Sequence, residues 1–162
     1  MKRFFIFLSV FFVFSSAVFS NEINFSDNLF EYGTDYSDVL NIMTYKGYTK
    51  YQNDNSFITF SSNDTYHCYD ILQYNYMFNN DKKLIANGYS LKYRGEKIQG
   101  DFYSLINVIL KQSNIYSRVN SNEQTTIYCH DISNDFSHLY YTISFSEKSK
   151  EINITMLSTS IK

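Results

Sequence analysis

The sequence contains no proline and no tryptophan, and only five glycines and two cysteines in 162 residues. Because the glycines are scattered, the chain has no glycine-rich loop of the kind that holds a nucleotide phosphate. Lysine and arginine number 14 and aspartate and glutamate 16, for a formal net charge of −2. That balance is unlike the basic surface of a nucleic-acid-binding protein, so we expect no nucleic-acid partner.

The first twenty residues have the three-part form of a secretory signal peptide. Lys2 and Arg3 form a basic start, an apolar stretch follows over residues 4–14, and small residues occupy 15–17. The apolar stretch is shorter than the ~20 residues that span a bilayer. No cysteine lies near the cleavage point to carry a lipid. We therefore predict a signal peptide at residues 1–20, one mature domain at 21–162 with no membrane span, and a secreted or periplasmic location.

Aromatic side chains are abundant, with 16 tyrosines and 15 phenylalanines, which is enough to build a core in a small domain. Two segments have helical patterns. In the first, residues 33–43, Asp35 is the expected N-cap and Val39, Ile42 and Met43 form an apolar stripe. The second covers residues 102–112, follows Asp101 and is broadly apolar.

Most of the remaining chain alternates with the period of a β-strand. One predicted hairpin has arms at residues 72–78 and 84–93, and a second has arms at 139–145 and 152–156. Shorter strands are expected at 56–61 and 125–130. The alternation predicts that one set of side chains points into the core: Leu72, Tyr74, Tyr76, Phe78, Leu139, Tyr141, Ile143 and Phe145.

The two hairpins align at a constant offset of about 67 residues, since Leu72 corresponds to Leu139 and Phe78 to Phe145. This order predicts an α+β fold of two tandem αβββ units, at about 33–93 and 94–162. Together the units would form an antiparallel sheet with the helices packed on one face. The alternative is that a mixed chain offers such matches by chance.

A short segment also resembles a known family. Residues 30–39, Phe-Glu-Tyr-Gly-Thr-Asp-Tyr-Ser-Asp-Val, are similar to the opening motif of small secreted bacterial domains of the beta-lactamase-inhibitor-protein-like group. The outer-membrane assembly lipoproteins of the SmpA/OmlA type are relatives of that group. The likeness covers nearly the whole mature chain in the order of its elements and implies a fold of two helix-plus-strand units in tandem.

Two departures limit what the resemblance implies. The group often has a tryptophan before the glycine, where this chain has Tyr32, and its inhibitor proteins hold a disulfide within each repeat, where this chain has one cysteine per repeat. Inhibition of a beta-lactamase is therefore not carried over. The resemblance implies a non-catalytic domain that binds another protein through its open sheet face, although fold alone does not fix function.

Cys68 and Cys129 are an even pair in a chain that we expect to be exported, which favours a disulfide between them. The alternative is two buried free thiols. His67 and His130 adjoin these cysteines, but neighbouring residues of a strand point to opposite faces, so the four side chains should not converge on a zinc ion. We expect no metal and no cofactor.

No arrangement of residues argues for an enzyme, because the one combination of a nucleophile with a base uses Cys129, which we expect to be buried. The best candidates for partner binding are the outward strand residues Tyr69, Met77, Tyr128 and Tyr140, since aromatic residues and methionine are enriched at interfaces. The sequence therefore predicts an exported protein-binding domain, inhibitory or associated with the cell envelope. The alternative function is a carrier of a small apolar ligand.

Overall fold

The computed structural model describes residues 28–54, 56–98, 100–111, 113–121, 123–131 and 139–160. The predicted signal peptide at residues 1–20 lies outside these ranges. Among the described residues, no helix has the length and apolar character needed to cross a membrane.

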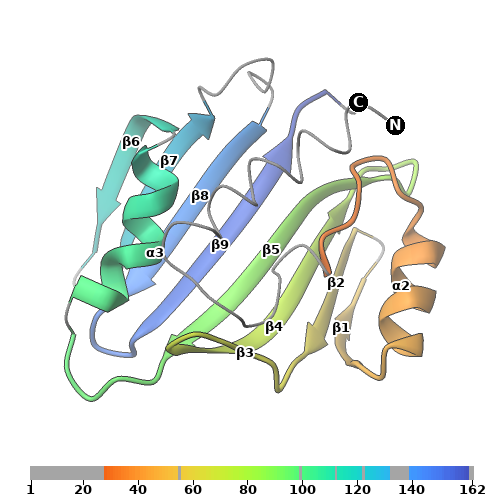
Figure 1. Ribbon diagram of the computed structural model, residues 1–162. Helices are drawn as coiled ribbons and strands as arrows, with labels where there is room; N and C mark the ends of the chain where they lie inside the picture. Colours follow the sequence, from red (N-terminus) through yellow and green to blue (C-terminus); the bar gives the residue numbers. More distant parts are fainter. Residues whose placement is uncertain are drawn as a thin grey trace.

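Two helices and nine strands make up the described chain (Figure 1). In order they are α2 (Tyr36–Tyr45), β1 (Thr49–Asn53), β2 (Phe57–Ser61), β3 (Thr65–Tyr66), β4 (Tyr69–Phe78), β5 (Leu84–Tyr93), α3 (Gly100–Lys111), β6 (Ser113–Asn120), β7 (Thr125–Asp131), β8 (Leu139–Ser146) and β9 (Glu151–Ser158). All strand pairs are antiparallel. They form one sheet in the order β1-β2-β4-β5-β9-β8-β7-β6, with β3 paired to β4.

The predicted fold of two αβββ units with helices packed on one face is wrong. The structure is a β-rich fold built on a single nine-stranded sheet, in which β1 and β6 add a strand directly after each helix. Figure 1 places α2 at the β1 end of the sheet and α3 at the β6 end, so the helices do not form a layer over the face. The two added strands escaped prediction because they are exposed edge strands whose apolar residues do not alternate with period two.

The helices begin and end close to the residues that the sequence suggested. Asp35 is the N-cap residue of α2, but its side chain makes no capping bond and instead pairs with Lys83 at 2.9 Å. Gly47 has a φ of +88°, the left-handed conformation that ends a helix, and donates its N–H to the Thr44 carbonyl. Val39 and Met43 are buried as expected, whereas Ile42 is exposed.

The core side of the sheet is filled by aromatic rings that contact one another edge to face. Ring centroids lie 5.0 Å apart for Tyr36 and Phe78, and 6.3 Å apart for Phe102 of α3 and Phe145 of β8. The buried Tyr76 hydroxyl donates to the Asn28 carbonyl at 2.8 Å. Each helix thus packs against the core through a few side chains at its own end of the sheet.

A register shift in β4 between Ile71 and Gln73 corrects one predicted orientation. The shift is a β-bulge, which adds a residue and reverses the alternation on its far side. Leu72 is therefore exposed, and Ile71 fills the core position in its place. Tyr74, Tyr76 and Phe78, beyond the bulge, are buried as predicted.

The pairing of β5 with β9 joins the sheet in its middle, and Gly88 lies opposite Thr155 there. A side chain at Gly88 would begin 3.2 Å from the Ile154 carbonyl oxygen, so the glycine permits a close approach of the two strands. From this pair outward the strand order is the same in both directions, β5-β4-β2-β1 and β9-β8-β7-β6. We call these the first and second halves of the sheet.

Candidate functional site: the outward face of the sheet

The strand register defines a face of the sheet that turns away from the core. Ile127 of β7, Ile143 of β8 and Ile154 of β9 are buried, and residues next to them along each strand point the other way. Directly paired residues share a face, so the register carries this assignment from strand to strand. We call this side the outward face.

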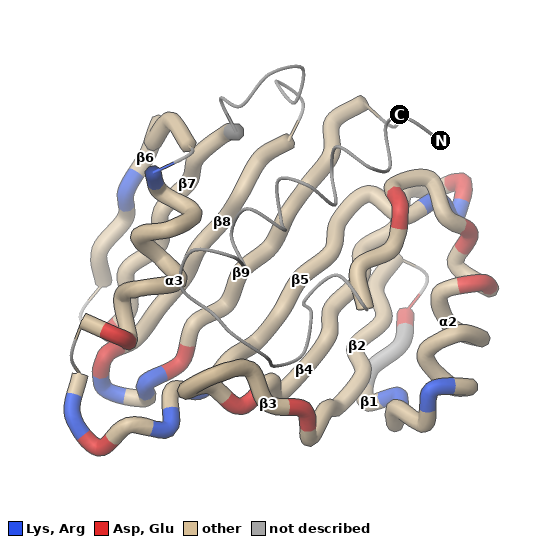
Figure 2. The backbone as a smooth tube through the Cα atoms, in the orientation of Figure 1, with Lys and Arg blue, Asp and Glu red and all other residues tan. Residues whose placement is uncertain are grey.

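Three rows of directly paired residues cross the outward face. The apolar row is Phe57, Met77, Ala86, Leu157, Tyr140 and His130; the middle row is Thr59, Asn75, Gly88, Thr155, Thr142 and Tyr128; the polar row is Ser61, Gln73, Ser90, Asn153, Ser144 and Thr126. No lysine, arginine, aspartate or glutamate stands in any row. Figure 2 agrees, because the charged residues lie at the ends and edges of the sheet and its central strands are uncharged along their middle.

Hydroxyl and amide side chains on this face bond sideways to one another. Thr59 Oγ1 donates to Asn75 Oδ1 at 2.9 Å, and Asn75 Nδ2 donates to Ser90 Oγ at 3.3 Å. The hydroxyls of Thr126 and Ser144 lie 2.9 Å apart. Such lateral bonds satisfy part of the polar groups of an uncharged face, and covering this face with a partner needs no charge to be desolvated.

Four rings gather where the outward face meets the β6 edge. Tyr116 lies at a register shift in β6 and contacts Tyr128, His130 and Tyr140, with centroid distances of 6.2, 6.5 and 6.2 Å. The rings of His130 and Tyr140 are 6.1 Å apart. We call these residues the tyrosine–histidine cluster. Tyr116 is 58% exposed, and the other three rings are half-buried.

The first half of the sheet has the same strand order without this cluster. A half-turn about the centre of the β5–β9 pair exchanges β7 with β2 and β8 with β4. This rotation brings the positions of Tyr128, His130 and Tyr140 onto those of Thr59, Ser61 and Gln73, respectively. The edge strand of the first half, β1, has a register shift at Tyr51, as β6 has at Tyr116. Because the same strand order forms with small polar residues, the rings in the second half are not explained by folding alone.

The four predicted partner-binding residues fall into three places. Tyr128 and Tyr140 lie on the outward face within the cluster, as predicted. Met77 is also outward and 40% exposed, but β5 and β9 separate its strand from β8.

Tyr69 was assigned to the wrong face. It is 0% exposed and donates its hydroxyl to the carbonyls of Asp101 at 2.6 Å and Phe102 at 3.1 Å. The reason is the bulge at Leu72, which reverses the alternation between Tyr69 and the rest of β4. Tyr116 was missed altogether, because its strand was not recognised.

The predicted disulfide is also wrong, because neither Cys68 nor Cys129 forms a disulfide in the structure. Cys68 directly precedes β4, and Cys129 lies in β7, with β5, β9 and β8 between them. At about 4.8 Å per strand, that separation is roughly 19 Å, far beyond the reach of an S–S bond. Cys129 is buried, and burial raises the pKa of the half-buried Cys68 thiol.

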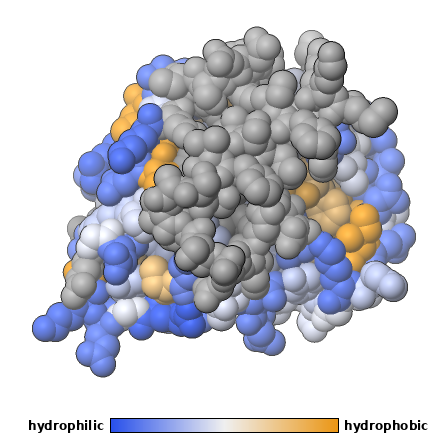
Figure 3. All heavy atoms as spheres, in the orientation of Figure 1, coloured by the Kyte–Doolittle hydropathy of each residue, from blue (hydrophilic) through white to orange (hydrophobic). Residues whose placement is uncertain are grey.

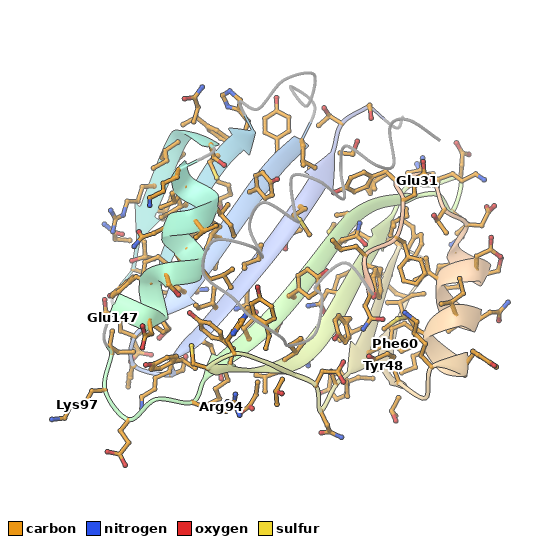
Figure 4. The ribbon with its side chains drawn as sticks, viewed as in Figure 1. Glu31, Tyr48, Phe60, Arg94, Lys97 and Glu147 are labelled. Carbon is orange, nitrogen blue, oxygen red and sulfur yellow. The ribbon has the colours of Figure 1, made fainter. Side chains whose placement is uncertain are left out.

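A second polar arrangement lies on the core side, at the end of the sheet near α2 (Figure 4 labels Tyr48 and Phe60 there). The hydroxyls of Tyr48 and Tyr74 both donate to Asp64 Oδ2 at 2.6 Å. Asn28 Nδ2 donates to the Tyr48 hydroxyl at 2.8 Å, and Lys46 Nζ donates to Asn28 Oδ1 at 2.8 Å. We call these five residues the Asp64 network.

The hydrogen bonds of the Asp64 network stabilise the ionised carboxylate of Asp64. Burial alone would raise the pKa of Asp64, but the hydrogen bonds from Tyr48, Tyr74 and Ser62 and the charge of Lys46 together lower it. Burial and the bond to Asp64 raise the pKa of Tyr48 and Tyr74. At neutral pH these shifts favour an ionised Asp64 and protonated Tyr48 and Tyr74, the charge states in which the two hydroxyls donate to the carboxylate.

Comparison of the chain with profiles of known protein families, with curated protein sequences and with solved structures found no significant match. The resemblance to the beta-lactamase-inhibitor-protein-like group therefore stays a prediction from the motif at residues 30–39.

Proposed function

We propose that this chain is a non-catalytic, protein-binding domain that acts outside the cytoplasm and docks its partner on the outward face of the sheet. The observation that carries the proposal is the tyrosine–histidine cluster at the border of a wide uncharged face. Aromatic side chains in a docking surface contribute large contact area with little loss of side-chain freedom. A surface without charge loses little on desolvation. The signal-like pattern at residues 1–20 supports the location.

The asymmetry between the halves also supports the proposal. Residues that only stabilise a sheet should recur where the same strand order recurs, yet Tyr128, His130 and Tyr140 correspond to Thr59, Ser61 and Gln73. A function confined to the second half explains why the rings stand there.

The second candidate, a carrier of a small apolar ligand, has less support. A carrier needs space between its helices and its sheet. At the α3 end, Phe102 contacts Tyr93, Tyr103 and Phe145, with centroid distances of 5.1–6.3 Å. At the α2 end, Tyr76 bonds to Met43 Sδ at 3.4 Å. Rings thus occupy the described interior beside both helices.

The proposal is tested by affinity capture with the mature chain, residues 21–162, as bait. Three baits are compared: the wild type, the Tyr128→Ala/Tyr140→Ala variant, and a Ser61→Ala/Gln73→Ala control on the same face of the first half. Far-UV circular dichroism checks that each bait is folded. We expect a protein that the wild type and the control retain and that the cluster variant loses.

Affinity for that protein should fall about thirtyfold in the cluster variant, because loss of an aromatic anchor residue costs about 2 kcal/mol. Equal retention by a folded cluster variant would reject the outward face. If no protein binds the wild type saturably, the protein-binding function itself is rejected.

A further inference from the structure

Strand β6 is an open edge of the sheet with an unusual concentration of exposed apolar side chains. Its one neighbour in the sheet is β7, so the other side of its backbone has no strand partner within the described sheet. Ile115, Tyr116 and Val119 are 54%, 58% and 54% exposed. Figure 3 shows apolar patches among hydrophilic residues on the side of the molecule where β6 lies.

These side chains lie on both sides of the sheet. Ile115 pairs with the buried Cys129 and so lies on the core side, while Val119 pairs with Thr126 on the outward face. A partner lying flat on one face would cover only one of them. An extended strand added along β6 would cover both, because its own side chains alternate between the two sides.

Natural proteins protect such edges with proline, charged side chains, β-bulges or short strands. Strand β6 runs for eight residues without proline or lysine. It has one charged residue, Arg118, and beyond its bulge at Tyr116 the pairing of residues 117–120 is regular. The opposite edge strand, β1, has five residues, and among its described side chains Tyr51 is the one large exposed hydrophobic, beside Lys50. The two edges therefore differ, and β6 is the one left suited to pairing.

Charge indicates what kind of strand would fit. Arg118 pairs with the buried Ile127, so it lies on the core side of the edge, and Lys111 ends α3 two residues before β6 begins. Both are exposed, and neither has an ion-pair partner among the described residues. A second copy of the chain would bring Arg118 or Lys50 against these cations, whereas carboxylates would be attracted to them.

We propose that β6 accepts an extended segment of a partner protein as an added strand of the sheet, with carboxylates alternating with apolar side chains. The carboxylates lie on the core side, toward Arg118 and Lys111, and the apolar side chains lie on the outward side, beside Tyr116 and Val119. This inference deepens the proposed function, because Tyr116 joins the edge to the tyrosine–histidine cluster. Backbone hydrogen bonds supply affinity and the alternating side chains supply specificity.

The test uses a fluorescein-labelled ten-residue peptide of alternating valine and glutamate, capped at both ends. One control peptide has lysine in place of glutamate, and a second has proline at its two central positions, which prevents strand pairing. Fluorescence anisotropy measures binding to the mature chain at low salt, and hydrogen exchange identifies the protected backbone amides. We expect saturable binding of the valine–glutamate peptide alone, with protection in β6.

Two substitutions at the edge are compared with a control at the opposite edge. Arg118→Glu exchanges one attraction for one repulsion and should weaken binding of the peptide about tenfold. Val119→Ser should also weaken it, by removing an apolar contact on the outward side without adding a charge. Lys50→Glu, on β1, should leave affinity unchanged. Both edge positions are exposed, so circular dichroism should show the wild-type fold.

Strand addition at β6 is overturned if the valine–glutamate peptide does not bind saturably, if it binds Arg118→Glu and the wild type equally, or if it protects β1 and not β6. A captured protein that depends on Tyr128 and Tyr140 would still uphold the proposed function in any of these cases. Peptide binding at β6 without any captured protein would instead uphold the edge and reject the wider proposal.

Discussion

Replacing Asp64 should destabilise the fold, by an amount that follows from its two phenolic donors. Tyr48 and Tyr74 each donate to Asp64 Oδ2 at 2.6 Å, and the Tyr74 ring is almost fully buried. A hydrogen bond to a charged group contributes about 1.5–3 kcal/mol. Because Tyr48 and Asp64 are half-buried, we take the lower end for each bond. Asp64→Ala should then cost about 3 kcal/mol.

Asp64→Asn is the matched control for this prediction. Its amide oxygen can still accept from both hydroxyls without the charge, so it should cost only about 1 kcal/mol. Urea unfolding of residues 21–162, followed by far-UV circular dichroism, measures both values. With a slope of about 1–3 kcal/mol per molar urea, the alanine variant should unfold at a midpoint lower by about 1–3 M.

The same network predicts a dependence on pH. The folded pKa of Asp64 is below its ordinary value of about 3.9, so its stabilising contribution is complete above that value. It is lost as the pH falls through the folded pKa, and Asp64→Asn should lose less stability over that range. Equal stability of the wild type and Asp64→Ala would refute the reasoning. So would a double-mutant cycle that found no coupling between Asp64→Ala and Tyr74→Phe.

Three further predictions concern other parts of the chain. Tyr69→Phe should lower the free energy of unfolding in urea by about 1–2 kcal/mol, because it leaves the Phe102 carbonyl without that donor. An unchanged midpoint would contradict the buried position of Tyr69. A thiol reagent should label Cys68 in the folded protein and Cys129 only after unfolding, since Cys129 is buried, and a chain with no free thiol after denaturation would contradict this. N-terminal sequencing of the exported protein should begin between Val18 and Asn21, and a chain that still starts at Met1 would disprove the signal peptide.

Uninterrupted strands were predictable from the sequence because alternation is a direct consequence of strand geometry. Ile143 and Phe145 are buried as predicted, and Tyr128 and Tyr140 point outward as predicted, since β7 and β8 pair without a register shift. The strand β5 has the predicted bounds. The prediction was wrong at Tyr69, where one extra residue in β4 reverses the pattern. A bulge adds no residue type that marks its position, so alternation alone could not reveal it.

The edge strands could not be recognised for a different reason. Strand β6 is exposed at most positions, so burial imposes no alternation on its residues. Its bulge at Tyr116 also places apolar residues on both sides of the sheet. The sequence therefore indicated two members of the tyrosine–histidine cluster as binding residues but not the strand that completes it. The disulfide prediction was wrong because the alternation along a strand shows to which face a cysteine points. It does not show how many strands lie between two cysteines.

The pairing of β5 with β9 also determines when the two halves of the sheet can join during synthesis. A chain emerges from the ribosome N-terminus first, so the first half is complete when residue 93 appears, while its partner β9 is the last strand to be made. At roughly 5–20 residues per second, β5 waits for several seconds with one side unpaired. During that interval the middle of the future sheet is a long exposed edge, and such edges recruit other chains. The close fit at Gly88 is thus achieved last, and a chain cut short before Glu151 keeps for good the edge that the full chain exposes only briefly.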